Sequence, residues 1–239
     1  LIGRRLQKCK KFIRRFLVVV IVAIVVADTI LFCRVFVANK LEQEINNKLH
    51  PETISLRIES SPAIAMVGGR VDVMRGVLEN VKLGNLNFAD VHMDVNNLEF
   101  SPIALFMNQT MEIQQMGKGE IEGTVTASDL KDFMEQAVKG LTIQDVVINS
   151  DGIEVVGSVD MGFVRGTASI KGNLEIKNNA LVFSPQRFEI NGAGIGGLNA
   201  SVLKQITIYD FAEFPIPVKA DRIETENGEL HLFVNPISK

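Results

Sequence analysis

The sequence predicts an α+β protein in which an N-terminal transmembrane helix precedes a long antiparallel β-sheet with a few short apolar helices laid against it. Three observations predict this class: an apolar run follows a cationic segment, later segments alternate apolar and polar residues, and tight-turn sequences separate them. Alternation with a period of two is typical of strands that have one apolar and one polar face. Short connections join antiparallel strands, because parallel strands require a long crossover.

The predicted membrane segment lies at the N-terminal end of the chain. Residues 1–15 carry seven basic residues and no acidic one, and apolar residues fill 16–27, 30–33 and 35–38. A bilayer core about 30 Å thick needs about 20 helical residues, so we expect an anchor over 16–38 after a basic cytoplasmic tip at 1–15. Basic flanks stay in the cytoplasm. We therefore expect a single-pass protein of the cytoplasmic membrane, with its N-terminus inside and residues 51–239 forming an extracytoplasmic domain.

A signal peptide is the alternative interpretation of the same pattern, since it also has a basic segment followed by an apolar one. Residues 25–27, directly before Asp28, are of a kind that a signal peptidase accepts. Cleavage there would expose the apolar residues of 30–37 to water. We therefore expect the anchor to be retained.

Composition restricts the function of the remainder. Residues 16–239 keep 18 of the 25 basic residues and all 28 acidic ones, a net charge of −10. A domain this acidic is a poor partner for nucleic acid, because phosphate binding depends on clustered Lys and Arg. Cys9 and Cys33 lie in the tip and in the apolar helix, so no disulfide framework is expected.

The predicted secondary structure begins with a helical stalk at 39–50, where Leu41, Ile45 and Leu49 form a stripe and Pro51 ends the helix. Strands follow. The clearest alternating segments cover residues 54–58, 91–95 and 167–177. The predicted hairpin turns are Asp151-Gly152, Asn178-Asn179 and Asn227-Gly228.

Four short helices are expected among the strands. Ser128 is a good N-cap for a helix over 129–139, and Gly140 is a good stop. Ser101-Pro102 is a second helix start. The other two predicted helices cover residues 61–68 and 198–205.

Gly192, Gly194 and Gly197 match the dinucleotide-binding spacing G-x-G-x-x-G. That fingerprint requires a βαβ unit feeding a parallel sheet. The 42 residues after Gly197 have the pattern of irregular chain and a hairpin, so we expect a Gly-rich turn instead.

The sequence contains no motif that favours an enzyme. His50, His92 and His231 are far apart and lack zinc-ligand spacing. No nucleophile elbow, paired Cys and His, or phosphate-binding loop is present. We expect no catalytic residues, no cofactor, no metal and no enzymatic activity.

An ordered pattern of strand, cap and turn positions extends from Gly76 to the C-terminal hairpin. Its segments are residues 77–84, 87–91, 98–102, 119–126, 128–130, 214–217 and 227–228. In this pattern the chain resembles the LmeA-like phospholipid-binding family of bacterial envelope proteins. The resemblance implies a curved antiparallel sheet wrapped around a few short helices, similar to half of a tubular lipid-binding module, and it implies phospholipid binding in the cell envelope.

Two functions remain open. The first is a membrane-tethered extracytoplasmic phospholipid-binding or lipid-transfer protein that maintains or builds the envelope, with phospholipid or another membrane lipid and the membrane as partners. The second is a structural or assembly partner with a closed core and no ligand. Met and Phe on the helix faces suit either a groove or a packed core. The lipid-groove candidates are Ile103, Phe106, Met107, Leu130, Phe133, Met134, Ala137 and Val138.

Overall fold

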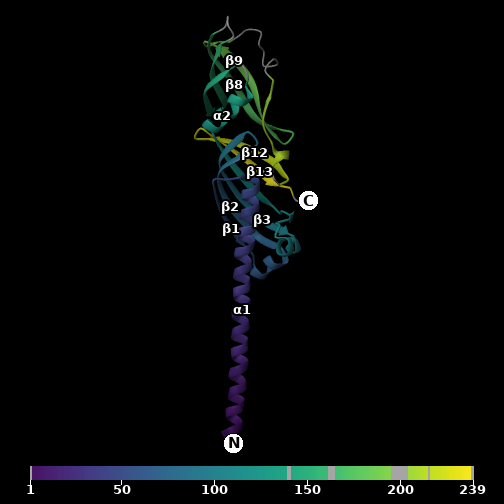
Figure 1. Ribbon diagram of the computed structural model, residues 1–239. Coiled ribbons are helices and arrows are strands. Elements are labelled where there is room, and N and C mark those ends of the chain that lie inside the picture. The colour runs from purple at the N-terminus through teal and green to yellow at the C-terminus, as the bar shows by residue number, and fades with distance from the viewer. Residues whose placement is uncertain (1, 139–140, 161–164, 195–203, 215, 238–239) are drawn as a thin grey trace.

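A long N-terminal helix projects from a two-sheet β domain (Figure 1). The computed structural model describes residues 2–138, 141–160, 165–194, 204–214 and 216–237, without the side chains of residues 2–15, 26, 29, 30 and 160. Its helices are α1 (Ile2–Leu49), η1 (Ala63–Gly68), η2 (Ala104–Asn108), α2 (Ala127–Ala137) and η3 (Phe211–Glu213). Its strands are β1 (Thr53–Glu59), β2 (Arg70–Leu83), β3 (Leu86–Phe100), β4 (Ile113–Gln115), β5 (Gly119–Thr126), β6 (Thr142–Asn149), β7 (Gly152–Asp160), β8 (Arg165–Lys177), β9 (Ala180–Ile190), β10 (Ala193–Gly194), β11 (Ile206–Asp210), β12 (Val218–Glu226) and β13 (Glu229–Pro236).

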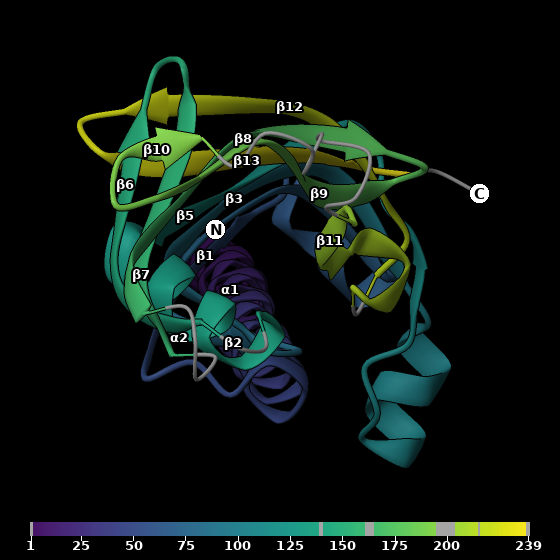
Figure 2. The same cartoon turned by 90° about the horizontal axis from the view of Figure 1, so that it is seen from above.

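The strands form two antiparallel sheets. The first sheet has the order β1-β2-β3-β5-β13-β12, with β4 paired to β3, and the second has the order β10-β9-β8-β7-β6, with β11 paired to β9. The C-terminal hairpin β12–β13 returns to the first sheet, where β13 pairs with β5. Strand β12 also contacts β6 and β8 of the second sheet. From above, the strands follow an arc (Figure 2).

The predicted fold class is wrong. We expected an α+β protein with a transmembrane helix and one long curved sheet wrapped around short helices, whereas the structure is mostly antiparallel β in two sheets. Within the described residues, no helix is long and apolar enough to cross a membrane. The expected transmembrane anchor and single-pass topology are therefore also wrong.

The physical reason for the failed anchor prediction lies in α1. Asp28 and Arg34 interrupt its apolar sequence, and the longest uninterrupted run, 16–27, is shorter than the about 20 residues that a span requires. Beyond this run Leu31, Phe32 and Val35 are exposed, and the buried side chains form one stripe with a spacing of four or eight residues. That stripe is buried on the β domain at Cys33, Val37, Leu41 and Leu49. The prediction therefore counted Cys33 and Val37, two side chains that belong to the core of the protein.

Local signals predicted the strands and two of the three turns correctly. The alternating segments 54–58, 91–95 and 167–177 lie in β1, β3 and β8. Asn178 and Asn179 have φ values of 51° and 61°, and Asn227 and Gly228 have 52° and 81°. A type I′ hairpin turn needs positive φ at both central residues, which Asn and Gly adopt at low cost. The predicted turn Asp151-Gly152 was one residue off, because Gly152 pairs with Asn149 and the β6–β7 connection is Ser150-Asp151.

Three of the four helix predictions were correct in position, and the predicted cap of one of them was wrong. Helix α2 is capped by Thr126 and not by Ser128: the Asp129 amide donates to Thr126 Oγ1 at 3.2 Å, and the Thr126 amide donates to the Asp129 carboxylate at 3.2 Å. This reciprocal pair is a capping box. The predicted helix at 61–68 is the 3₁₀ helix η1, and the one at 101–107 is the π-helical η2. Most of the predicted helix at 198–205 lies outside the described residues.

The interior contains two apolar clusters. The larger joins both sheets and α2, with Leu130, Phe133 and Met134 of α2 buried in it. The smaller lies between the C-terminal half of α1, η1 and strands β1 to β4, and Val37 and Leu41 belong to it. The helix α1 is therefore fixed to the first sheet by its last four turns.

Candidate functional site

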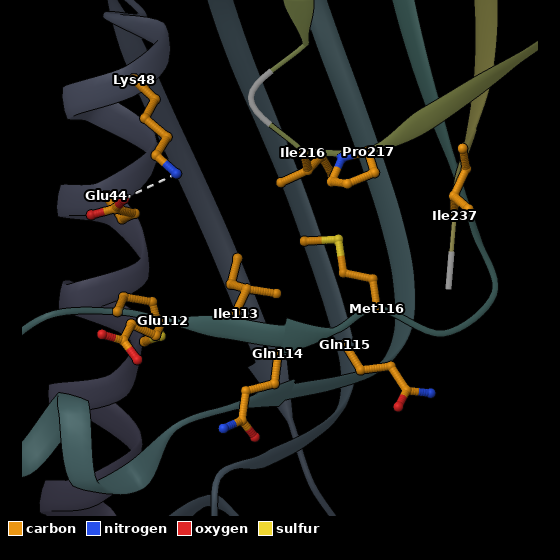
Figure 3. Close-up of a pocket in the computed structure, with 11 residues that line it drawn as sticks. Glu44, Lys48, Glu112, Ile113, Gln114, Gln115, Met116, Ile216, Pro217 and Ile237 are labelled. Carbon is orange, nitrogen blue, oxygen red and sulfur yellow. Dashed lines mark ion pairs between the residues drawn. The ribbon is translucent and has the colours of Figure 1, made fainter. Parts of the chain in front are cut away.

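A wide opening lies between the end of α1 and strand β4. It has a volume of about 430 Å³, which falls within the range of about 300 to 1,000 Å³ typical of ligand pockets. Figure 3 shows Glu44 and Lys48 on α1 across the opening from Met116, Ile216 and Pro217. We call this opening the mouth. Its lining residues are Glu44, Lys48, Met111, Glu112, Ile113, Gln114, Gln115, Met116, Ile216, Pro217 and Ile237.

The mouth leads into an apolar space, which we call the chamber. Ile113, Met116 and Ile216 line both spaces, together with Glu44 and Lys48. These three apolar residues form a constriction that we call the throat. Every other chamber residue is apolar: Leu41, Ile45, Leu49, Met74, Met93, Val95, Ile121 and Phe214.

A third space continues the chamber toward η3, and we call it the far end. Ile121 and Phe214 line both, and Phe88, Gly123 and Tyr209 lie deeper. A Cβ atom at Gly123 would lie only 2.7 and 2.8 Å from two carbons of the Phe88 ring, so glycine is what allows this ring to lie over β5. Because neighbouring spaces share lining residues, we call mouth, chamber and far end together the groove of the first sheet.

Tyr209 is the one tyrosine of a chain that has no tryptophan. Its ring makes edge contacts with Phe88 and Phe211, at centroid distances of 6.3 and 5.3 Å. Burial raises the pKa of its phenol to about 12, and the carboxylates of Glu213 and Asp210 contribute to the rise. The phenol is therefore neutral at physiological pH, and the far end carries no charge from this side chain.

The interior of the groove is narrow. The chamber holds about 60 Å³ of free space and the far end about 20 Å³. Three of the chamber residues are methionines, Met74, Met93 and Met116. Methionine is unbranched and adapts its shape to a neighbour. The free space of the chamber is therefore too small for a chain-like apolar ligand unless methionine side chains move.

The charged side chains of the groove lie at the mouth, where Glu44 and Lys48 also border the chamber. Lys48 Nζ lies 3.1 Å from Glu44 Oε1, and both side chains are partly exposed. The side chains of Glu112, Gln114 and Gln115 are exposed beside them. Within the described part of the chain, no buried side-chain nitrogen or oxygen lacks a hydrogen-bond partner. The groove interior therefore offers a ligand apolar contact and no unsatisfied polar group.

The structure does not bring the predicted groove candidates together. Leu130, Phe133 and Met134 are buried in the larger core. Ala137 is exposed, and Val138 is half-buried at the end of α2. None of the eight candidates lines the mouth, the chamber or the far end. Whether any of them contacts lipid stays a prediction.

The other three candidates lie at the surface beside α1. Ile103 is 68%, Phe106 42% and Met107 79% exposed. Phe106 stacks on Phe36 of α1 at a centroid distance of 5.8 Å, and Phe36 in turn stacks on Phe32 at 6.0 Å. These contacts attach η2 to the helix while Ile103 and Met107 face water.

Sequence reasoning missed the true groove residues because they come from four distant segments. Residues 41–49, 74–95, 111–123 and 209–217 supply almost all of them. One signal was available. The segment 214–217 belongs to the pattern that carries the family resemblance, and Phe214 and Ile216 line the groove.

The glycine and histidine motifs have structural roles. Gly192 has a φ of 77° in the turn between β9 and β10, and Gly197 lies outside the described residues. His92 Nε2 lies 3.2 Å from Asp90 Oδ1, and His231 Nδ1 lies 3.0 Å from Glu122 Oε1. Among the residues that the structure describes, no cluster of His, Cys, Asp and Glu is arranged to hold a metal ion.

Comparison with known proteins gives one match. The profile of the LmeA-like phospholipid-binding family matches residues 28–234. This match includes the second half of α1, both sheets and every groove residue except Ile237. No curated protein and no solved structure matches the chain.

Proposed function

Because the chain belongs to the LmeA-like phospholipid-binding family, we propose that it binds a phospholipid in the groove and carries it within the bacterial cell envelope. The acyl chain occupies the chamber and the far end, and the headgroup stays at the mouth. The protein holds or transfers the lipid without changing it chemically. This role maintains or builds the envelope.

The observation that carries this proposal is the separation of apolar and polar side chains along the groove. Apolar side chains line the chamber beyond Glu44 and Lys48, whereas the mouth combines carboxylate, amine and amide groups with apolar side chains. A phospholipid has the same separation, with apolar acyl chains at one end and a polar headgroup at the other. Each methylene that leaves water for the interior contributes about 0.8 kcal/mol.

The length of the groove also suits an acyl chain. Along β3 its lining runs from Val95 to Phe88. Seven residue steps at about 3.3 Å each give about 23 Å, and the hydrocarbon of one leaflet, half of the bilayer core, is about 15 Å thick. The narrow chamber then widens as Met74, Met93 and Met116 move aside.

The exposed side chains beside α1 support contact with a membrane surface. Ile103 and Met107 of the η2 segment and Ile64 and Val67 of η1 are large, apolar and exposed. Phe106 of η2 stacks on Phe36 of α1, and η1 also packs against α1. The segments η1 and η2 therefore lie beside the same helix. In this proposal the side chains enter the interfacial layer of a bilayer, so that Ile103, Phe106 and Met107 contact lipid outside the groove.

Native mass spectrometry of the full chain tests lipid binding. The protein is purified in a mild detergent, incubated with phospholipid vesicles, separated from them and transferred to the gas phase. We expect a 1:1 complex, and dissociation should release an intact phospholipid. A protein that stays without lipid would refute the proposal and favour the second function, a structural partner with a closed core.

Membrane contact is tested by vesicle co-sedimentation. The double variant Ile103→Asp, Met107→Asp should sediment less with phospholipid vesicles, while its lipid uptake from detergent micelles stays unchanged. Val147→Asp is the control, because Val147 is an exposed apolar residue on β6 outside the groove. Equal sedimentation of both variants would exclude η2 as the contact.

A further inference from the structure

The charges around the mouth determine which headgroup it accepts. Lys48 is the one cation among the described residues that line it, whereas Glu44 and Glu112 contribute two carboxylates. Glu44 is paired with Lys48 at 3.1 Å. Within the described part of the chain, Glu112 forms no ion pair and its side chain is exposed. The mouth therefore carries a net charge of −1, with an acidic group available for a second cation.

A headgroup that is only anionic is a poor fit for these charges. Its phosphate would meet one amine, which Glu44 already neutralises, and two carboxylates of its own sign. Opposite charges favour and like charges disfavour a bound group. A headgroup with both a phosphate and an amine meets Lys48 with the phosphate and Glu112 with the amine.

The kind of amine is also restricted. A quaternary ammonium has no N–H to donate, and proteins bind it against aromatic faces. None of the described residues lining the mouth is aromatic. The carboxylates of the mouth and the exposed amide of Gln114 have oxygens that accept hydrogen bonds from a primary ammonium.

We infer that the groove selects phospholipids whose headgroup combines a phosphate with a primary amine, the chemistry of a phosphoethanolamine. Lys48 binds the phosphate, and Glu112 accepts hydrogen bonds from the ammonium. This selection rests on the proposed function, because it needs a lipid in the groove. Solvent-exposed ion pairs support a preference of about two- to fivefold.

Competition between headgroups tests the inference. The full chain is incubated with vesicles of equal parts phosphatidylethanolamine, phosphatidylglycerol and phosphatidylcholine with identical acyl chains, and the bound lipid is identified by native mass spectrometry. We expect the ethanolamine lipid to exceed each of the others about two- to fivefold. The variant Glu112→Gln should lose this preference, and Glu112→Lys should favour the glycerol lipid.

The control makes the same change in charge away from the groove. Glu226 is exposed at the turn end of β12, whereas Val218 at the opposite end of the strand pairs with Pro236 beside the mouth. Glu226→Lys should keep the ethanolamine preference. Lipid bound without a headgroup preference, or a preference that Glu112→Lys leaves unchanged, would overturn the inference and leave the proposed function intact. Absence of any bound lipid would overturn both.

Discussion

Replacing Ile113 with tryptophan places an indole ring in the throat, where the mouth meets the chamber. Ile113 lines both spaces and is half-buried, so the larger ring has the mouth to expand into. We therefore expect the variant to fold with a nearly unchanged melting temperature. Its defect should be specific: an acyl chain still reaches the mouth but no longer enters the chamber.

The size of this defect follows from the apolar interior. Each methylene kept out of the chamber forfeits about 0.8 kcal/mol, which is about a fourfold change in affinity. A variant that excludes about four methylenes loses about 3 kcal/mol, so its affinity falls on the order of a hundredfold. The first methylenes, which remain in the mouth, should contribute as they do in the unmodified protein.

Titration calorimetry with a series of short-chain phospholipids measures this effect. For the unmodified protein, the affinity should rise about fourfold with each methylene until the chain fills the groove. For Ile113→Trp, the rise should stop after the first few methylenes. Val147→Trp is the control, because it adds the same ring to an exposed position on β6. An unchanged slope in Ile113→Trp, or an equal loss in both variants, would refute the proposed path of the acyl chain.

Three further predictions concern the fold that holds the groove. Thr126→Ala should lower the free energy of unfolding by about 0.5 to 2 kcal/mol because it removes the cap of α2, whereas Ser128→Ala should leave it unchanged. Urea denaturation measures both, and equal losses would contradict the assignment of Thr126 as the cap. Gly228→Val should destabilise the protein by about 1 to 2 kcal/mol, because valine resists the left-handed conformation, and thermal unfolding should show a smaller loss for His92→Ala at its exposed position. Ultraviolet absorbance should show the Tyr209 phenolate of the folded protein only near pH 12. Because the phenol of the unfolded chain ionises near pH 10, the free energy of unfolding should fall by about 1.4 kcal/mol per pH unit between these two values. Ionisation at pH 10 in the folded protein would show that the ring is not buried.

The strands and turns could be predicted because their signals are local. The alternation over 167–177 determines the apolar and polar faces of β8. Asn227-Gly228 favours a hairpin turn whichever sheet its two strands join. The sequence alone does not determine the N-cap of α2, since Thr126 and Ser128 are both good cap residues. Only the contact with Asp129 distinguishes them, and that depends on where β5 ends.

The groove could not be predicted from helix faces, because one apolar pattern serves two purposes. Leu130, Phe133 and Met134 have the spacing of an inward face, but they fill the space between the sheets. The groove is instead formed by sheet residues such as Met93 and by Ile216, which meet only after the C-terminal hairpin joins the first sheet. The anchor prediction failed because Asp28 and Arg34 interrupt the apolar run of α1, and because Cys33 and Val37 are buried on the domain.

Photochemical crosslinking shows whether the end of a bound acyl chain lies in the groove. A phospholipid with a diazirine near the end of one acyl chain is loaded into the full chain, irradiated, and the attachment sites are mapped by peptide mass spectrometry. The account predicts attachment to chamber and far-end residues such as Met93, Ile121 and Phe214. Attachment confined to Ile103, Phe106 and Met107, or no attachment at all, would contradict it.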